Sequence, residues 1–94
     1  MNEFEWDNAK AESNLRKHGV AFEAACRVFD DAFALDRIDT RMNYDEERFL
    51  ITGIVRGMLL TVAYAERGGR LRIISARKAD RHEQRDYYRS QAPE

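Results

Sequence analysis

The sequence predicts an α+β fold in which two N-terminal helices and a C-terminal helix pack on one face of an antiparallel β-sheet. Apolar residues recur at helical spacing near the N-terminus, a capping-box pattern near the C-terminus indicates a further helix, and the middle of the chain holds apolar segments of strand length. Short glycine-containing turns separate these segments, and strands joined by such turns must pair antiparallel. A chain of 94 residues supports one modest core, so residues 1–94 are expected to form a single domain.

The chain is expected to open with a short strand and a capped helix. Residues 4–6 alternate two aromatic side chains with a glutamate, which favours a strand. Asp7 is a suitable N-cap for the helix that follows. Lys17 and His18 bring cations to the last turn of this helix, and Gly19 is the residue type that commonly ends one.

A second, shorter helix and an extended segment come next. The helix is expected where four apolar residues form one stripe: Phe22, Ala25, Cys26 and Phe29. Asp30 and Asp31 should end this helix, and an extended segment over 33–39 leads into a polar loop over 41–47. The single cysteine, Cys26, is expected to be a buried apolar thiol, and a chain without a possible internal disulfide suits a reducing cytoplasm.

Three strands and a helix complete the predicted fold. The strands are expected over 48–55, 58–66 and 70–78. Asp80, with Glu83 three positions later, resembles a capping box that opens a helix to about Arg89. The N-terminus lacks a signal peptide, and the longest apolar run is too short to span a bilayer, so no membrane association is expected.

Charge is unevenly distributed along the chain. Residues 1–47 carry 6 Lys and Arg against 12 Asp and Glu, whereas residues 48–94 carry 10 against 5. This asymmetry favours two surfaces, one acidic and one basic and phosphate-seeking. The alternative is that the two halves interleave in space and neutralise each other.

The pattern of reactive side chains favours chemistry without a metal or cofactor. The two histidines, His18 and His82, are far apart, and no His-x-x-x-His or Cys-x-x-Cys spacing occurs. Gly68 and Gly69 lack the Lys-Ser/Thr of a phosphate-binding loop, and no nucleophile elbow is present. Acid–base and electrostatic catalysis remains, which for an RNA phosphodiester needs a base, an acid and cations around the phosphorane.

The segment 66–79 carries the cations that such chemistry needs. Arg67 and Arg77 flank its strand pair, and guanidinium groups match phosphate geometry well. On the helix that follows, arginines recur every fourth residue: Arg81, Arg85 and Arg89.

The charged residues of this segment and the arginines of the helix also have a structural explanation. Glu66 and Arg67 could form an ion pair at the hairpin end, and the helical arginines could be a solvated face paired with Glu83 and Asp86.

His18 and the two adjacent tyrosines have structural explanations of the same kind. His18 is well placed to act as a helix C-terminal cation. Tyr87 and Tyr88 are the only large apolar side chains of the last helix. At least one of them must therefore pack on the sheet, and we expect the other at the surface.

The chain resembles the BrnT toxins over nearly its whole length. The N-terminal resemblance lies in Phe4-Glu5-Trp6-Asp7, Lys10, Asn14, Lys17-His18-Gly19-Val20, Phe22-Glu23-Ala24-Ala25 and Val28-Phe29-Asp30-Asp31. The C-terminal resemblance lies in Tyr64-Ala65-Glu66-Arg67, Arg72-Ile73-Ile74-Ser75-Ala76-Arg77-Lys78-Ala79, Glu83, Arg85 and Tyr88. The chain departs from the family pattern in two places. The segment 36–47 is richer in charge than is expected for the family, and Asp80 precedes Arg81 at a place where the family often has a small polar residue.

The resemblance implies a RelE-like endoribonuclease toxin of a type II toxin–antitoxin system, which inhibits translation and growth. It also implies a BrnA-like antitoxin that forms a complex, expected to be a heterotetramer, and that alone contacts operator DNA. Combined with the residues above, it suggests that Arg67, Arg77 and Arg81 neutralise phosphate. The base would be Glu66 or His18. The acid would be Lys17, Lys78 or Tyr88. RNA would also be bound by Lys17, Lys78 and Arg85.

Two other functions are compatible with the sequence. A non-catalytic module that binds a partner and tunes antitoxin-mediated repression would share the basic surface but would not turn over RNA. A protein that binds DNA directly is disfavoured, because no helix-turn-helix is visible and the net charge of −1 is unusual for a duplex binder.

Overall fold

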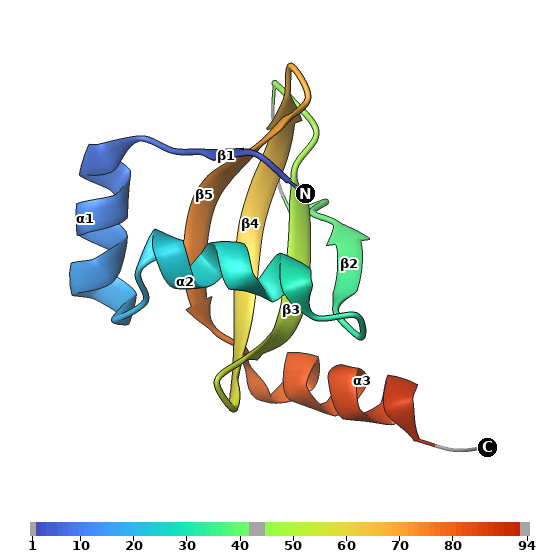
Figure 1. Ribbon diagram of the computed structural model, residues 1–94. Coiled ribbons are helices and arrows are strands. Elements are labelled where there is room, and N and C mark those ends of the chain that lie inside the picture. The colour runs from blue at the N-terminus through green and yellow to red at the C-terminus, as the bar shows by residue number, and fades with distance from the viewer. Residues whose placement is uncertain (1, 42–44, 93–94) are drawn as a thin grey trace.

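A five-stranded sheet forms the centre of the protein, with strand order β1-β5-β4-β3-β2 (Figure 1). The computed structural model describes residues 2–41 and 45–92. The strands are β1 (Phe4–Glu5), β2 (Leu35–Ile38), β3 (Phe49–Val55), β4 (Met58–Arg67) and β5 (Arg70–Lys78). Strands β2 to β5 form the antiparallel meander that the sequence predicts, and the turns at 56–57 and 68–69 join the hairpins.

Within the described residues, three α-helices and one 3₁₀ turn accompany the sheet. They are α1 (Asn8–His18), α2 (Phe22–Cys26), η1 (Arg27–Asp30) and α3 (Arg81–Gln91). The predicted caps are confirmed. The Asp7 side chain accepts from the first amides of α1, Gly19 ends that helix at φ 70°, and Asp80 with Glu83 forms a capping box on α3. No helix in the described ranges 2–41 and 45–92 is long and apolar enough to cross a membrane.

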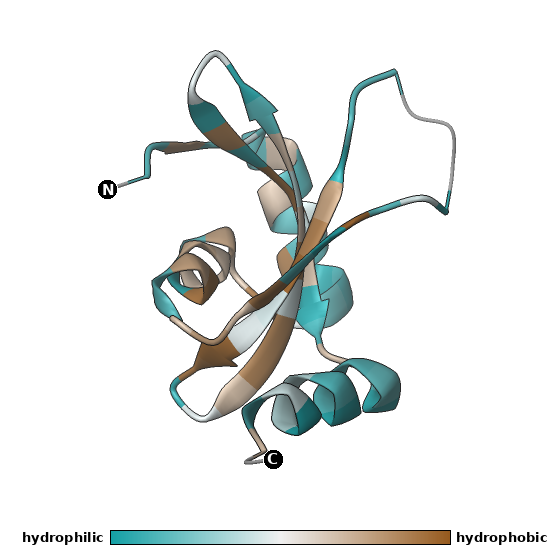
Figure 2. Ribbon diagram, turned by 90° about the vertical axis from the view of Figure 1, so that its right-hand side faces the viewer, coloured by the Kyte–Doolittle hydropathy of each residue, from teal (hydrophilic) through white to brown (hydrophobic). Residues whose placement is uncertain are grey.

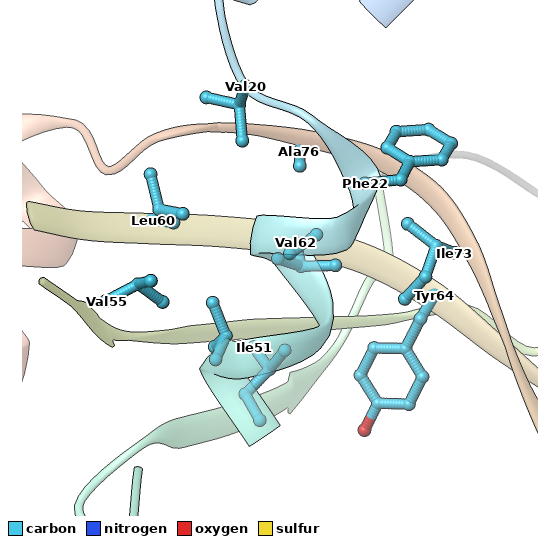
Figure 3. Packing of buried hydrophobic residues seen from close by; sticks show 11 residues of the cluster. Val20, Phe22, Ile51, Val55, Leu60, Val62, Tyr64, Ile73 and Ala76 are labelled. Atoms are coloured by element: carbon cyan, nitrogen blue, oxygen red, sulfur yellow. The ribbon is translucent and has the colours of Figure 1, made fainter. Parts of the chain in front are cut away.

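The main core lies between the sheet and the two N-terminal helices (Figure 3). Alternate residues of β4, Leu60, Val62 and Tyr64, point toward α2, where Phe22 is fully buried. Cys26 at the end of α2 is half-buried, and burial together with the charge of Glu23 raises its thiol pKa to about 11. The cysteine is therefore a protonated, apolar side chain at neutral pH.

The first strand extends the sheet in a way that the sequence does not reveal. Residues 4–5 of β1 pair parallel with residues 71–72 of β5, at the edge opposite β2. Its aromatic neighbours enter the core, since the Phe4 ring packs on Phe29 and the Trp6 ring packs edge-on against Phe22. The N-terminus thereby anchors the edge of the sheet on which α1 lies.

The prediction that all helices share one face of the sheet is wrong for α3. Glu83 of α3 bonds the side chain of Thr61, which points away from Leu60, Val62 and the core. Figure 2 shows α2 and α3 on different sides of the sheet. We call the side away from α1 and α2 the open face; it carries Arg37, Thr52, Thr61, Arg67, Arg72 and Arg77. The helix α3 covers only one end of this face.

Candidate functional site

Arginines line the open face, and carboxylates of the same chain pair with them. Three of these ion pairs join distant segments: Arg67 with Glu46, Arg70 with Glu3, and Arg72 with Glu5. A fourth joins Arg37 to Glu83. Each of these pairs links a residue before position 48 to one after it. The acidic and basic halves of the sequence therefore interleave in space, and the expected division into separate acidic and basic surfaces is wrong.

Five hydrogen bonds converge on the carboxylate of Glu83, at the end of the open face that α3 covers. Its Oε1 accepts from Arg77 Nη1 at 2.7 Å, from Thr61 Oγ1 at 2.9 Å and from the Asp80 amide at 2.9 Å. Its Oε2 accepts from Arg37 Nη2 at 2.7 Å and from Arg77 Nη2 at 3.0 Å. We call Arg37, Thr61, Arg77 and Glu83 the Glu83 cluster. It joins β2, β4, β5 and α3.

Glu83 is ionised in this cluster. Only 6% of the residue is exposed, and burial alone would raise its pKa. Hydrogen bonds from Arg77, the Asp80 amide, Arg37 and Thr61 outweigh burial and lower the pKa to about 2. A carboxylate with so low a pKa and five donors is a poor proton acceptor at neutral pH, so Glu83 is unsuited to be a general base.

The guanidinium groups of the Glu83 cluster remain open to solvent. The side chain of Arg77 is 29% exposed and that of Arg37 is 46% exposed. The hydrogen bonds that Arg77 donates to Glu83 raise the pKa of Arg77, against the opposing effects of burial and of the charge of Arg41. Arg41 itself forms a two-point ion pair with the buried Asp39. This end of the open face therefore holds three arginines, which pair with the carboxylates of Asp39 and Glu83.

Several of the residues that the sequence suggested for the site lie near this end of the molecule. Arg77 belongs to the Glu83 cluster, Lys78 follows it in β5, and Arg81 and Arg85 are exposed on α3. Lys78 and Tyr88 line an open cavity of about 240 Å³ next to the β3–β4 turn. Tyr88 is 56% exposed whereas Tyr87 is buried, so the expected division between one surface and one core tyrosine is confirmed.

Arg67 and Glu66 lie at the opposite end of the sheet. Arg77 stands across from Thr61, and Arg67 is six positions further along β4, which corresponds to about 20 Å. Glu66 points to the other face, and Arg67 makes a two-point pair with Glu46 in place of the ion pair with Glu66 that was the structural alternative. The structure therefore does not bring these two residues to the phosphate site suggested for Arg77.

Lys17 and His18 end α1, which packs beside β5 rather than on the open face (Figure 1). His18 is half-buried and Lys17 is exposed. Neither residue is among the donors to Glu83. The suggested residues thus form three separate groups. One lies at α3, one at the β4–β5 hairpin and one at the end of α1.

Sequence reasoning missed Arg37 and Thr61, and it recognised Glu83 only as a helix cap and a partner for helical arginines. One signal was available. Thr52 and Thr61 are polar residues inside otherwise apolar strands, and their hydroxyl groups are buried and 2.8 Å apart. Buried hydroxyls need partners, so this pair marks a polar network on that face of the sheet. The pairing of Arg37 with Glu83, 46 residues apart, has no local signal.

Comparison with known protein families gives one match. A family model described as the ribonuclease toxin BrnT of type II toxin–antitoxin systems matches residues 6–83. This range begins just after β1 and includes α1, α2, η1, all of β2 to β5 and the start of α3 up to Glu83. No curated protein matches the chain.

Proposed function

The chain belongs to the BrnT family of ribonuclease toxins of type II toxin–antitoxin systems, and on this basis we propose that it cleaves RNA without a metal ion at the α3 end of the open face. The observation that carries this proposal is the pair of part-exposed arginines held by one ionised carboxylate. Fixed guanidinium groups supply the positive charge that a metal ion would otherwise bring to a developing phosphorane.

The proposed reaction is attack of the RNA 2′-hydroxyl on the adjacent phosphorus. A base takes the hydroxyl proton, the bond to the 5′ oxygen breaks, and an acid protonates that oxygen. Arg77 would hold the phosphate, with Arg81 and Arg85 guiding the RNA backbone along α3. Tyr88 is the favoured acid candidate, because it lines the cavity beside the strand end that carries Arg77. Lys78 lines the same cavity, but it alternates with Arg77 in β5 and so points to the other face of the sheet.

The two residues that the sequence suggested as the base lie away from Arg77. Glu66 is five positions along β4 from the partner of Arg77, about 17 Å away, and on the other face. His18 ends α1 and does not lie on the open face either, so neither of these two residues is assigned as the base, and Lys17 beside His18 would contact RNA away from the scissile phosphate. Arg67, at the far end of the open face, would bind the RNA chain rather than the scissile phosphate.

The proposed partners follow from the family. A toxin of a type II system has an antitoxin partner, and we propose that it is a BrnA-like DNA-binding protein that forms a heterotetramer with this chain in the cytoplasm. Cleavage of RNA by the free toxin would stop translation and growth. Contact with operator DNA would occur only through the antitoxin.

The central test is Arg77→Ala. This substitution should remove growth arrest on induced expression and slow RNA cleavage about 100-fold, because one fixed donor to the phosphorane is lost. The readouts are the growth of the induced culture and gel analysis of total RNA, and a thermal unfolding curve confirms that the variant folds. Arg72→Ala is the matched control, because it removes another β5 arginine that is paired with a single carboxylate.

The same assay tests independence from metals. Cleavage by the wild-type protein should stay within about twofold when EDTA is added, since guanidinium groups take the role of the cation. Undiminished toxicity of Arg77→Ala would overturn the assignment of the phosphate site. Loss of wild-type cleavage in EDTA, restored by a divalent ion, would overturn the metal-free mechanism.

A further inference from the structure

We propose that Arg37 is a second phosphate-binding residue and that Glu83 positions Arg37 and Arg77 as one clamp for a single phosphodiester group. This inference rests on the proposed RNA cleavage at the same end of the open face. It adds two residues from distant parts of the chain, one on the edge strand β2 and one on α3.

The geometry brings both guanidinium groups to one oxygen atom. Arg37 Nη2 and Arg77 Nη2 lie 2.7 Å and 3.0 Å from Oε2 of Glu83. Two atoms that both contact one oxygen at these distances are within about 6 Å of each other, close enough for the oxygens of one phosphate to accept from both groups. Like charges at this separation repel, and the carboxylate between them offsets that repulsion.

Both arginines keep donors for a ligand. A guanidinium group has five N–H donors. Among the described contacts, Arg37 uses one of them, for Glu83, and Arg77 uses its two terminal nitrogens for Glu83 and the Lys78 carbonyl. The two side chains are 46% and 29% exposed, so the remaining N–H groups can reach solvent.

The carboxylate is fixed more firmly than the arginines that it holds. Glu83 is buried, and it also accepts from Thr61 Oγ1 and from the Asp80 amide. These two donors come from the centre of the sheet and from the start of α3, so they hold the carboxylate independently of the arginines. The cluster itself holds one carboxylate against two guanidinium groups, while the charges of Asp80 and Arg41 act on Arg77 in opposite directions.

A purely structural role would be a weak reason for this arrangement. Replacing a whole buried ion pair by apolar residues is often neutral for stability, because desolvation offsets the attraction between the charges, although removing only one partner is costly. A network that holds two cations at a fixed separation is what binding a phosphorane requires, since preorganised donors need no rearrangement as charge develops. Glu83 is therefore assigned as a positioning residue, and Arg37 and Arg77 as the groups that contact phosphate.

The test compares four variants of the full chain: Arg37→Ala, Arg37→Lys, Glu83→Gln and the control Arg72→Ala. Single-turnover cleavage of RNA gives the rate, and fluorescence anisotropy with a 2′-O-methyl RNA oligonucleotide, which cannot be cleaved, gives the affinity. Thermal unfolding verifies folding. Glu83→Gln keeps the shape of the capping residue, and Arg37→Lys keeps the charge, so each retains part of the native network.

The clamp predicts a distinct pattern of rates and affinities. Arg37→Ala should cleave about 100-fold more slowly than wild type, and Arg37→Lys should recover little, because lysine lacks the two-point fork. Glu83→Gln should bind the oligonucleotide within about threefold of wild type but cleave at least about tenfold more slowly. A fifth protein that combines Arg37→Ala with Glu83→Gln should be no slower than Arg37→Ala alone, since both changes act on one unit.

Other outcomes overturn the clamp. Cleavage by Arg37→Ala within about threefold of Arg72→Ala would remove Arg37 from the site. Faster cleavage by Glu83→Gln would show that the carboxylate competes with phosphate instead of positioning its partners. If the wild-type protein cleaves no RNA, the proposed function fails and the oligonucleotide affinity decides the clamp. Equal affinities of Arg37→Ala and Arg72→Ala would then overturn it, and weaker binding by Arg37→Ala would support it.

Discussion

The side chain of Asn14 takes the place of a neighbouring strand. Its Nδ2 donates to the Ala76 carbonyl at 2.8 Å, and its Oδ1 accepts from the Ala76 amide at 3.0 Å. The same Nδ2 donates to the Val20 carbonyl at 2.9 Å. Strand β1 pairs with β5 only at residues 71–72, so the backbone of Ala76 needs this substitute partner at the edge of the sheet.

We expect Asn14→Ala to lower the free energy of unfolding by about 2–3 kcal/mol, because it leaves buried backbone donors and acceptors without partners. Urea unfolding followed by circular dichroism measures the change. Asn8→Ala is the matched control at an exposed position of α1, and it should change stability by less than about 0.5 kcal/mol. Equal effects of the two substitutions would contradict the role given to Asn14.

At the scale of single residues, the candidate site was only partly predictable from the sequence. Arg77 stands out because it ends a strand just before a capped helix, and this is a local pattern. Glu83 was recognisable as a capping residue for the same reason, but its bonds to Arg37 and Thr61 depend on how α3 meets the sheet. Arg67 and Arg77 could belong to one phosphate site only if the pairing of β4 with β5 brought them together, and the observed register places them at opposite ends of this strand pair.

At the scale of elements, local signals predicted most of the fold. The caps, the glycine turns and the strand periodicity gave α1, α2, β3, β4, β5 and α3 nearly as observed. Contacts between distant segments were not predictable, such as the parallel pairing of β1 with β5. Gly53 is a further example. A Cβ atom there would lie 2.9 Å from a methyl group of Val28, so η1 packs directly on the backbone of β3.

The capping box of α3 should contribute measurably to stability. The Asp80 side chain accepts from the Glu83 amide at 2.8 Å, and the Glu83 side chain accepts from the Asp80 amide at 2.9 Å. Asp80→Ala removes the first of these bonds and should lower the free energy of unfolding by about 1 kcal/mol in urea titrations. Asp80→Asn keeps a side-chain acceptor and should stay close to wild type, and a loss as large as that of Asp80→Ala would contradict the capping explanation.

At the scale of the whole molecule, ion pairs tie the acidic first half of the chain to the basic second half. The pairs of Glu3, Glu5 and Glu46 with β4 and β5 arginines lie along the sheet, and the Glu83 cluster lies at its α3 end. The exposed pairs contribute little each, because water and salt screen them. Glu83 is the exception, since it is buried and its pKa is lowered to about 2.

Acid should therefore destabilise the protein mainly through the Glu83 cluster. A carboxylate with a lowered folded-state pKa stabilises the fold above its unfolded pKa of 4.5, and this contribution is lost as pH falls toward about 2. The loss across this window should be on the order of 3 kcal/mol. Urea unfolding at several pH values between 7 and 2 measures it.

Glu83→Gln separates this residue from the other titrating groups. Glutamine does not titrate, so the variant should be less stable at pH 7, and its stability should fall less steeply between pH 4.5 and 2. The stability of the variant should still fall somewhat with pH, because Asp31 also has a lowered pKa. Burial would raise the pKa of Asp31, but hydrogen bonds from Tyr87 and from backbone amides lower it. Glu12→Gln on the exposed side of α1 controls for the substitution itself. If Glu83→Gln kept the full wild-type slope, Glu83 could not be the group whose protonation destabilises the fold, because the variant has lost that proton-binding site.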